Sequence, residues 1–100
     1  MSYIISNKQL QKKFKHAEIF GIEENFNRKN LELFKNEMTQ HLRDPKTKMI
    51  KSIFRNNEVF HHFKSETKIN MMFYRNSKEF LSCWKLSEKQ IEYIMKDGKI

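Results

Sequence analysis

The residues best suited to chemistry form a short basic segment, Lys12-Lys13-Phe14-Lys15-His16. Histidine has an ordinary pKa of about 6.5, so it can transfer protons near neutral pH. Lys13 precedes His16 by three residues, so on a helix the two share one face and a fixed cation lies beside the imidazole. Lys15 lies about 100° round the helix and is expected to reach substrate or water. Taken alone, the segment is more typical of an ordinary basic helix with a surface histidine.

A second candidate segment has the sequence FLSCWK and alternates as a β-strand would. Period two places Phe80, Ser82 and Trp84 on one face, and Leu81 and Cys83 on the other, where they would meet a helix-packed core. Trp84 would then be exposed on an open face beside Ser82. Its indole could stack on an unpaired RNA base, or it could simply pack over an edge of the sheet.

Other familiar kinds of site have little support in the sequence. One Cys and four scattered His, without CxxC or HExxH spacing, predict no metal site. His61 and His62 are adjacent, so on a strand they would point to opposite faces, with one ring packed and one solvated. Neither GxGxxG nor a P-loop occurs, and we expect no cofactor of any kind.

The chain is strongly basic, with 20 Lys and Arg against 12 Asp and Glu, for a formal net charge of +8. Such an excess is typical of proteins that bind a polyanion or an acidic protein, and charge alone does not choose between them. The excess is uneven, because the first 16 residues contain four lysines and no acidic residue, whereas three glutamates follow at once. The lysine-rich start could also be a plain solvated face.

Capping patterns predict the helix that carries the basic segment. Ser6 followed by Gln9 forms a capping box, and Ile5 and Leu10 occupy the positions of a hydrophobic staple around it. A helix is therefore predicted over about residues 6–20, ending near glycine 21.

The rest of the chain predicts another helix, a sheet and a last helix. Residues 28–43 place apolar side chains on one helical face. Ser87 and Gln90 repeat the capping box, so a final helix is predicted over 87–97, closed by Gly98. Between these helices, β-branched, aromatic and Met residues at period two predict four antiparallel strands. The strands are expected near residues 48–55, 58–64, 68–74 and 79–86.

Helices followed by a run of strands predict an α+β fold, in which N-terminal helices pack on a small four-stranded antiparallel sheet and a short C-terminal helix follows. With 100 residues, one Pro and two Gly there is no linker, so we expect a single domain over residues 1–100. The lone cysteine cannot form an internal disulfide, and no apolar run approaches the ~18 residues that span a bilayer. The N-terminus has no secretory signal, as expected for a domain of a longer protein.

Together, the two candidate segments resemble a known family. The segment KFKHA at residues 13–17, followed by IFGI, is similar to the KFKHA…FGI segment of colicin D-like anticodon nuclease domains. The segment EFLSCWK at residues 79–85 is similar to their EFLSGWK. The separation of the two segments and the pattern between them also agree. Cys83 stands where the family has Gly, and because we expect its side chain to point inward, activity should survive with altered local packing.

The resemblance implies a toxin endoribonuclease that cuts the anticodon loop of tRNA without a metal ion. The implied fold is that of the small α+β ribonuclease superfamily with barnase-like and RelE-like enzymes. Relatives occur in colicins and other bacteriocins, and at the C-termini of contact-dependent growth inhibition toxins. The resemblance also assigns roles: His16 as the catalytic histidine, Lys13 and Lys15 as active-site lysines, and Ser82 and Trp84 as strand residues facing the cleft.

Metal-free cleavage would use the 2′-hydroxyl of the RNA as nucleophile and leave a 2′,3′-cyclic phosphate. His16 would act as general base or general acid, Lys13 would stabilise the phosphorane, Ser82 would bond a phosphate oxygen or the 2′-hydroxyl, and Trp84 would hold a loop base. The residues expected to contact the tRNA backbone are Lys12, Lys15, Arg55 and Arg75.

Such a toxin must be silenced in the cell that makes it, so the expected protein partner is an acidic immunity protein that covers the basic cleft. The domain itself is expected to be monomeric, to have no membrane-spanning segment, and to be secreted or delivered from the cell surface within a larger toxin. It would act in the cytoplasm of the target cell. Two alternatives stay open: a basic module that binds nucleic acid without cutting it, and a ribosome-dependent mRNA interferase of the RelE type.

Overall fold

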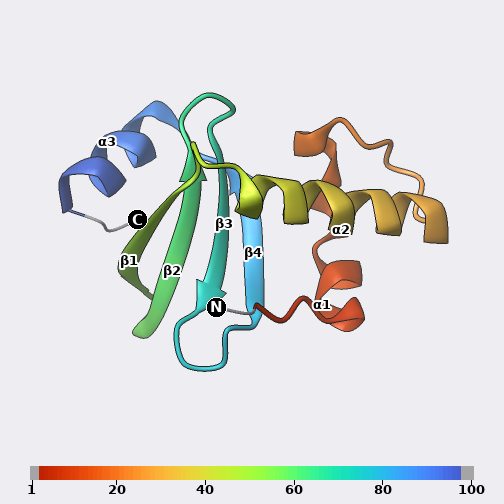
Figure 1. Ribbon diagram of the computed structural model, residues 1–100, viewed down its shortest axis with the longest axis horizontal. Coiled ribbons are helices and arrows are strands. Elements are labelled where there is room, and N and C mark those ends of the chain that lie inside the picture. The colour runs from red at the N-terminus through yellow and green to blue at the C-terminus, as the bar shows by residue number, and fades with distance from the viewer. Residues whose placement is uncertain (1–2, 98–100) are drawn as a thin grey trace.

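The computed structural model describes residues 3–97, in which helices precede a four-stranded sheet and one helix follows it (Figure 1). The elements are α1 (Asn7–Lys12), the 3₁₀ helix η1 (Phe14–Phe20), α2 (Arg28–Arg43), β1 (Lys48–Phe54), β2 (Asn57–Lys64), β3 (Ile69–Tyr74), β4 (Phe80–Lys85) and α3 (Glu88–Asp97). The predicted α+β class is confirmed, and each strand end lies within one residue of its predicted position. Gly98, the predicted end of the last helix, lies outside the described residues.

The sheet is an antiparallel meander with the strand order β1-β2-β3-β4. Phe54 pairs with Asn57, so the β1–β2 turn consists of Arg55 and Asn56, with φ angles of 47° and 68°. Two consecutive residues with positive φ are typical of the type I′ turn, whose twist matches that of the strands. The turn therefore lies one residue before the predicted position and presents Arg55 at the tip of the hairpin.

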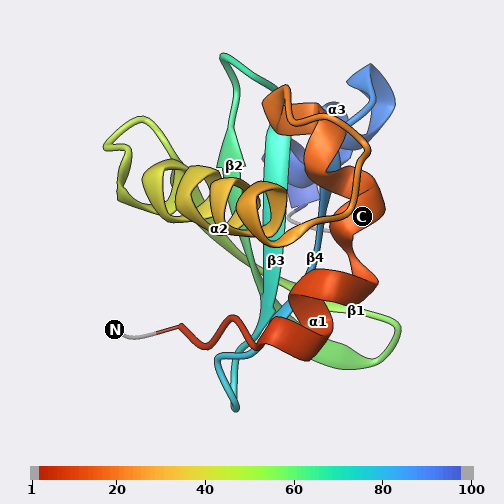
Figure 2. The same ribbon diagram turned by 90° about the vertical axis from the view of Figure 1, so that its right-hand side faces the viewer.

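Helices α2 and α3 cover opposite faces of this sheet (Figure 2). On one face, Phe34 and Met38 of α2 pack with Phe73 of β3 in the larger core, and each is fully buried. Each such side chain stabilises the fold by roughly 1.5–3 kcal/mol. On the other face, Ile94 of α3 packs with Phe63 in a smaller cluster. The sheet face that was expected to be open is thus partly covered by α3.

The predicted first helix is interrupted. It begins as expected, because the Ser6 side chain accepts a hydrogen bond from the Gln9 backbone nitrogen, but it breaks at Lys13 (φ −101°, ψ 9°) and continues as the 3₁₀ helix η1. Packing explains the change, since the tighter winding brings Phe14 and Ala17, three residues apart, onto one row that is buried in the core. A single α-helix over residues 6–20 was therefore wrong.

Strand β4 contains a β-bulge that changes which side chains share a face. Phe80 and Ser82 pair with successive residues of β3, which leaves Leu81 as the extra residue. Phe80 and Cys83 consequently lie in the core under α2, whereas Ser82 lies on the opposite face. Placing Phe80 on the same face as Ser82, and Leu81 in the core, was wrong; the burial of Cys83 is confirmed.

Both adjacent histidines of β2 are buried, so the expectation of one solvated ring was wrong. On the α2 side, His62 Nε2 lies 2.6 Å from the hydroxyl of Tyr3. On the α3 side, His61 Nδ1 lies 2.8 Å from the amide nitrogen of Asn70, and its ring meets Trp84 edge-on. Burial lowers the pKa of each histidine from 6.5 to about 4.

Candidate functional site

A groove of about 490 Å³ lies where α1, the tip of the β1–β2 hairpin, β4 and the start of α3 meet. We call it the basic groove. It brings together five of the predicted site residues, namely Lys12, Lys13, Arg55, Ser82 and Trp84. The other residues that line it are Gln9, Phe54, Met72, Leu81 and Gln90.

A hydrogen bond between α1 and β4 fixes two sides of the basic groove against each other. The Gln9 side chain does not complete the predicted capping box but donates from Nε2 to the carbonyl oxygen of Leu81, at 2.7 Å. Leu81 is the bulged residue of an edge strand, where backbone groups lack a neighbouring strand. This bond holds the lysines at the end of α1 close to the Ser82 and Trp84 side chains of β4.

The basic groove concentrates positive charge. Lys13 is half-buried, and its pKa is lowered first by burial and then by the positive charges of Lys15 and Lys12, with a smaller effect from Arg55. These cations repel one another in the free protein. A bound anion such as phosphate would relieve that repulsion, so the groove is electrostatically suited to an anionic ligand.

His16 lies in η1, the helix that begins directly after Lys13. Its backbone nitrogen donates to the Lys13 carbonyl oxygen at 2.9 Å. The ring is half-buried, and its pKa is lowered by burial, by the charge of Lys15 and, less strongly, by that of Lys13. A lowered pKa favours the neutral imidazole at neutral pH, which is the form that a general base requires.

His16 and Lys15 do not line the basic groove itself. They lie in η1, which follows the groove residue Lys13 along the chain and packs against β4. The structure therefore places η1, the helix that carries His16, beside β4, the edge strand that carries Ser82 and Trp84.

Trp84 is half-buried, not fully exposed as predicted. It packs against the cluster of Phe63, Leu86 and Ile94 under α3, and its ring meets that of His61 edge-on, with centroids 6.3 Å apart. One part of the indole still lines the basic groove. A tryptophan held in this way gives a preorganised surface for stacking.

The structure does not bring Arg75 to the basic groove. Its Nε donates to the Val59 carbonyl oxygen at 3.0 Å, and its Nη2 donates to that of Ser52 at 2.6 Å. Its Nη1 lies 3.7 Å from the Glu58 carboxylate. Arg75 lies in the turn between β3 and β4, and its side chain therefore ties this turn to β1 and β2.

Sequence reasoning missed Gln9 and Gln90 as groove residues, because both were explained by helix capping. Gln90 does cap α3, since its Oε1 accepts from the Ser87 nitrogen and its own nitrogen donates to Ser87 Oγ, each at 3.1 Å. Nothing local in the sequence indicates that these two residues would line one groove.

Residues 3–97 contain neither a candidate metal site nor a membrane-spanning helix. In this part of the chain, no group of three or more His, Cys, Asp or Glu side chains is placed to hold a metal ion. None of the helices described here combines the length and apolar character needed to cross a membrane.

Three comparisons relate the chain to known proteins. The sequence model of the Colicin D family matches residues 9–94, a range that contains every predicted site residue. Colicin-D of Escherichia coli is 35% identical over 83 residues, which are 82% of this chain and only 12% of the colicin. A solved structure, described as a ribonuclease from Escherichia coli complexed with its inhibitor protein, superposes with a TM-score of 0.81 at 30% identity, covering 92% of this chain and 100% of that one. Because the family match runs from the first helix to the last, the chain belongs to the Colicin D family.

Proposed function

We propose that this chain is the ribonuclease domain of a bacterial toxin, and that it cuts the anticodon loop of tRNA without a metal ion. The observation that carries the proposal is the basic groove, which Lys12 and Lys13 line together with Ser82 and Trp84. His16 lies in the adjoining helix η1. The similarity to a solved Escherichia coli ribonuclease supports the same reaction class.

In the proposed reaction, neutral His16 removes the proton of a 2′-hydroxyl, and that oxygen attacks the adjacent phosphorus. The bond to the 5′-oxygen breaks, this oxygen takes up a proton, and a 2′,3′-cyclic phosphate remains. Lys13 and Lys15 stabilise the negative charge that builds on the nonbridging oxygens. In comparable sites, one such donor lowers the activation free energy by roughly 3 kcal/mol. Ser82 bonds a phosphate oxygen or the attacking hydroxyl.

Single-stranded RNA fits the basic groove better than a duplex does. The groove, at about 490 Å³, has the size of a small-ligand pocket and combines cations with the apolar side chains of Phe54, Met72 and Leu81. Unpaired bases can leave the stack and lie against aromatic side chains, as Trp84 would require. A tRNA anticodon loop presents such bases next to an exposed phosphodiester.

A protein inhibitor is part of the proposal. The solved relative is described in complex with its inhibitor protein, and the concentration of cations in the basic groove suits an acidic surface that imitates RNA. We propose an acidic immunity protein of this kind. The domain would reach the target-cell cytoplasm as a monomeric part of a larger secreted or surface-delivered toxin.

The experiment is a digest of total tRNA by the purified chain in the presence of EDTA. The proposal expects discrete fragments cut in anticodon loops. Intact tRNA at micromolar protein would overturn it. Cleavage of translated message alone would favour the RelE-type alternative, and binding without cleavage would favour a module that binds nucleic acid only.

The two arginines that were expected to contact RNA should now behave differently. Arg55→Met removes an exposed cation from the basic groove, so the slope of log affinity against log salt should fall by about 1. Arg75→Met removes two hydrogen bonds to carbonyl oxygens, so the free energy of unfolding should fall by about 1–3 kcal/mol while the salt slope stays unchanged. Urea unfolding measures the stability of each variant, and tRNA binding at several salt concentrations measures its salt slope. A lower salt slope in Arg75→Met and a lower stability in Arg55→Met would contradict these assignments.

A further inference from the structure

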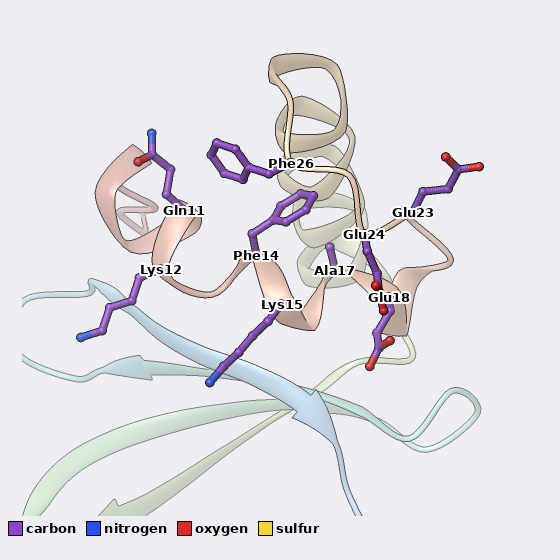
Figure 3. A pocket seen from close by; sticks show the side chains of 9 residues that line it. All are labelled: Gln11, Lys12, Phe14, Lys15, Ala17, Glu18, Glu23, Glu24 and Phe26. Atoms are coloured by element: carbon purple, nitrogen blue, oxygen red, sulfur yellow. The ribbon is translucent and has the colours of Figure 1, made fainter.

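A second pocket, of about 520 Å³, adjoins the basic groove and lies between η1 and the loop that leads into α2 (Figure 3). We call it the Phe26 pocket, after the aromatic ring on its wall. Lys12 lines both this pocket and the basic groove. We propose that the Phe26 pocket binds an unpaired RNA base beside the cleaved phosphate and prefers guanine. This inference rests on the proposed ribonuclease function.

The aromatic wall of the pocket is preorganised. The Phe26 ring is 58% exposed, yet it meets the buried ring of Phe14 edge-on, with centroids 5.2 Å apart. The loop is tied on both sides of Phe26, since Asn30 Nδ2 donates to the Asn25 carbonyl oxygen and the Asn27 side chain accepts from the Asn30 backbone nitrogen, each at 2.8 Å. A large apolar ring that is held in place and left in solvent offers a face on which a base can stack.

The charges around the pocket are divided between its two ends. Lys12 and Lys15 point toward the sheet and away from Phe26 (Figure 3), and Lys12 also lines the basic groove. The carboxylates of Glu18 and Glu24 lie beside each other beyond Ala17, at the end opposite to Lys12, whereas that of Glu23 points away from them (Figure 3). A phosphate would be attracted to the lysine end and repelled from the carboxylate end, so a nucleotide would enter with its base toward the glutamates.

The carboxylate end determines which base fits. An ionised carboxylate only accepts hydrogen bonds. Guanine presents its ring N–H and its amino group side by side, so one carboxylate can accept two parallel hydrogen bonds from it. Uracil presents one ring N–H between two carbonyl oxygens, which a carboxylate repels. The pocket therefore favours guanine over uracil at the position next to the scissile bond.

The test uses trinucleotides with 2′-deoxy sugars, d(UGU) and d(UUU), which lack the nucleophile and cannot be cut. Titration of the ¹⁵N-labelled chain by NMR gives both affinities and the residues that respond. We expect d(UGU) to bind about fivefold or more tightly than d(UUU), because only guanine can donate two parallel hydrogen bonds to one carboxylate. The amide signals of Gln11, Phe14 and Phe26 should shift with d(UGU).

Variants separate stacking from carboxylate contacts. Phe26→Ala should remove the preference, whereas Phe26→Tyr should keep it. Glu24→Gln combined with Glu18→Gln should reduce the preference without weakening d(UUU). Leu33→Ala, which truncates an exposed apolar side chain of α2 outside the pocket, is the matched control and should change nothing.

Equal affinity for the two trinucleotides, no binding of either, or a preference that survives in Phe26→Ala would overturn the inference. Because neither probe is cut, this result is independent of cleavage. A chain that cuts tRNA but binds both probes alike retains the proposed function and loses the guanine pocket. A chain that prefers d(UGU) but cuts no RNA retains the guanine pocket and loses the proposed ribonuclease function.

Discussion

Replacement of His16 by Ala is expected to lower the rate of tRNA cleavage by about 10²–10⁴-fold, while folding and RNA binding persist. The ring is half-buried in η1 and has no part in the main core, so its removal should cost little stability. The lysines of the basic groove remain and continue to bind the phosphates. Single-turnover cleavage of tRNA, thermal unfolding and tRNA binding measure the three properties separately.

The control for this variant is Lys13→Met. It removes a groove cation that is proposed both to bind the RNA phosphate and to stabilise the negative charge that builds on it during cleavage. It should weaken tRNA binding as well as the rate, whereas His16→Ala should affect the rate alone. Activity of His16→Ala above a tenth of the unmodified level would contradict the catalytic role. Loss of folding in that variant would instead indicate a structural histidine.

The pH dependence gives an independent check on His16. Its pKa is lowered by burial, then by Lys15 and Lys13, so kcat/KM should stay high somewhat below pH 6.5 before it falls as the ring becomes protonated. Lys15→Met removes the larger charge effect and should move this fall toward higher pH. An unchanged profile in Lys15→Met would show that the two groups are not coupled.

Acid is expected to unfold the domain before its carboxylates are protonated. His61 and His62 are buried with pKa values lowered from 6.5 to about 4, so the folded state holds both rings neutral. The unfolded chain binds protons at about pH 6.5, so stability is complete above that pH and is lost as the pH falls toward 4. Each histidine contributes about 3 kcal/mol, and the two together approach the whole stability of a small domain.

Urea unfolding at several pH values between 7.5 and 4.5 measures this loss. His61→Gln keeps an oxygen that can bond Asn70 but cannot be protonated, so it should reduce the pH dependence by about half. An unfolding free energy that is the same at pH 7.5 and pH 4.5 would contradict the burial of these rings.

Local patterns predicted the elements whose ends depend on local contacts. The capping residues of α3 and the apolar face of α2 lie close together in the chain, as do the turns that delimit the strands. Distant contacts determine what was missed. The break at Lys13 depends on packing of η1 in the core, and the bulge at Leu81 accompanies a hydrogen bond from Gln9. No local pattern reports either contact.

The same distinction applies to the site. The two motifs identified Lys13, Ser82 and Trp84, and the structure places these three in one groove. Arg75 has the same charge as Arg55, but only the fold shows that its guanidinium is bonded to two carbonyl oxygens. The Phe26 pocket depends on a loop without any motif, so it could be recognised only from the arrangement of η1 and α2.

The most direct test of the account is the chemistry of the ends that the chain leaves on tRNA in EDTA. If His16 activates the 2′-hydroxyl, each cut in the anticodon loop should leave a 2′,3′-cyclic phosphate on one fragment and a 5′-hydroxyl on the other. Mapping of the ends and treatment with a phosphatase that opens cyclic phosphates identify both. Fragments that carry 3′-hydroxyl and 5′-phosphate ends, or tRNA that stays intact, would contradict the mechanism.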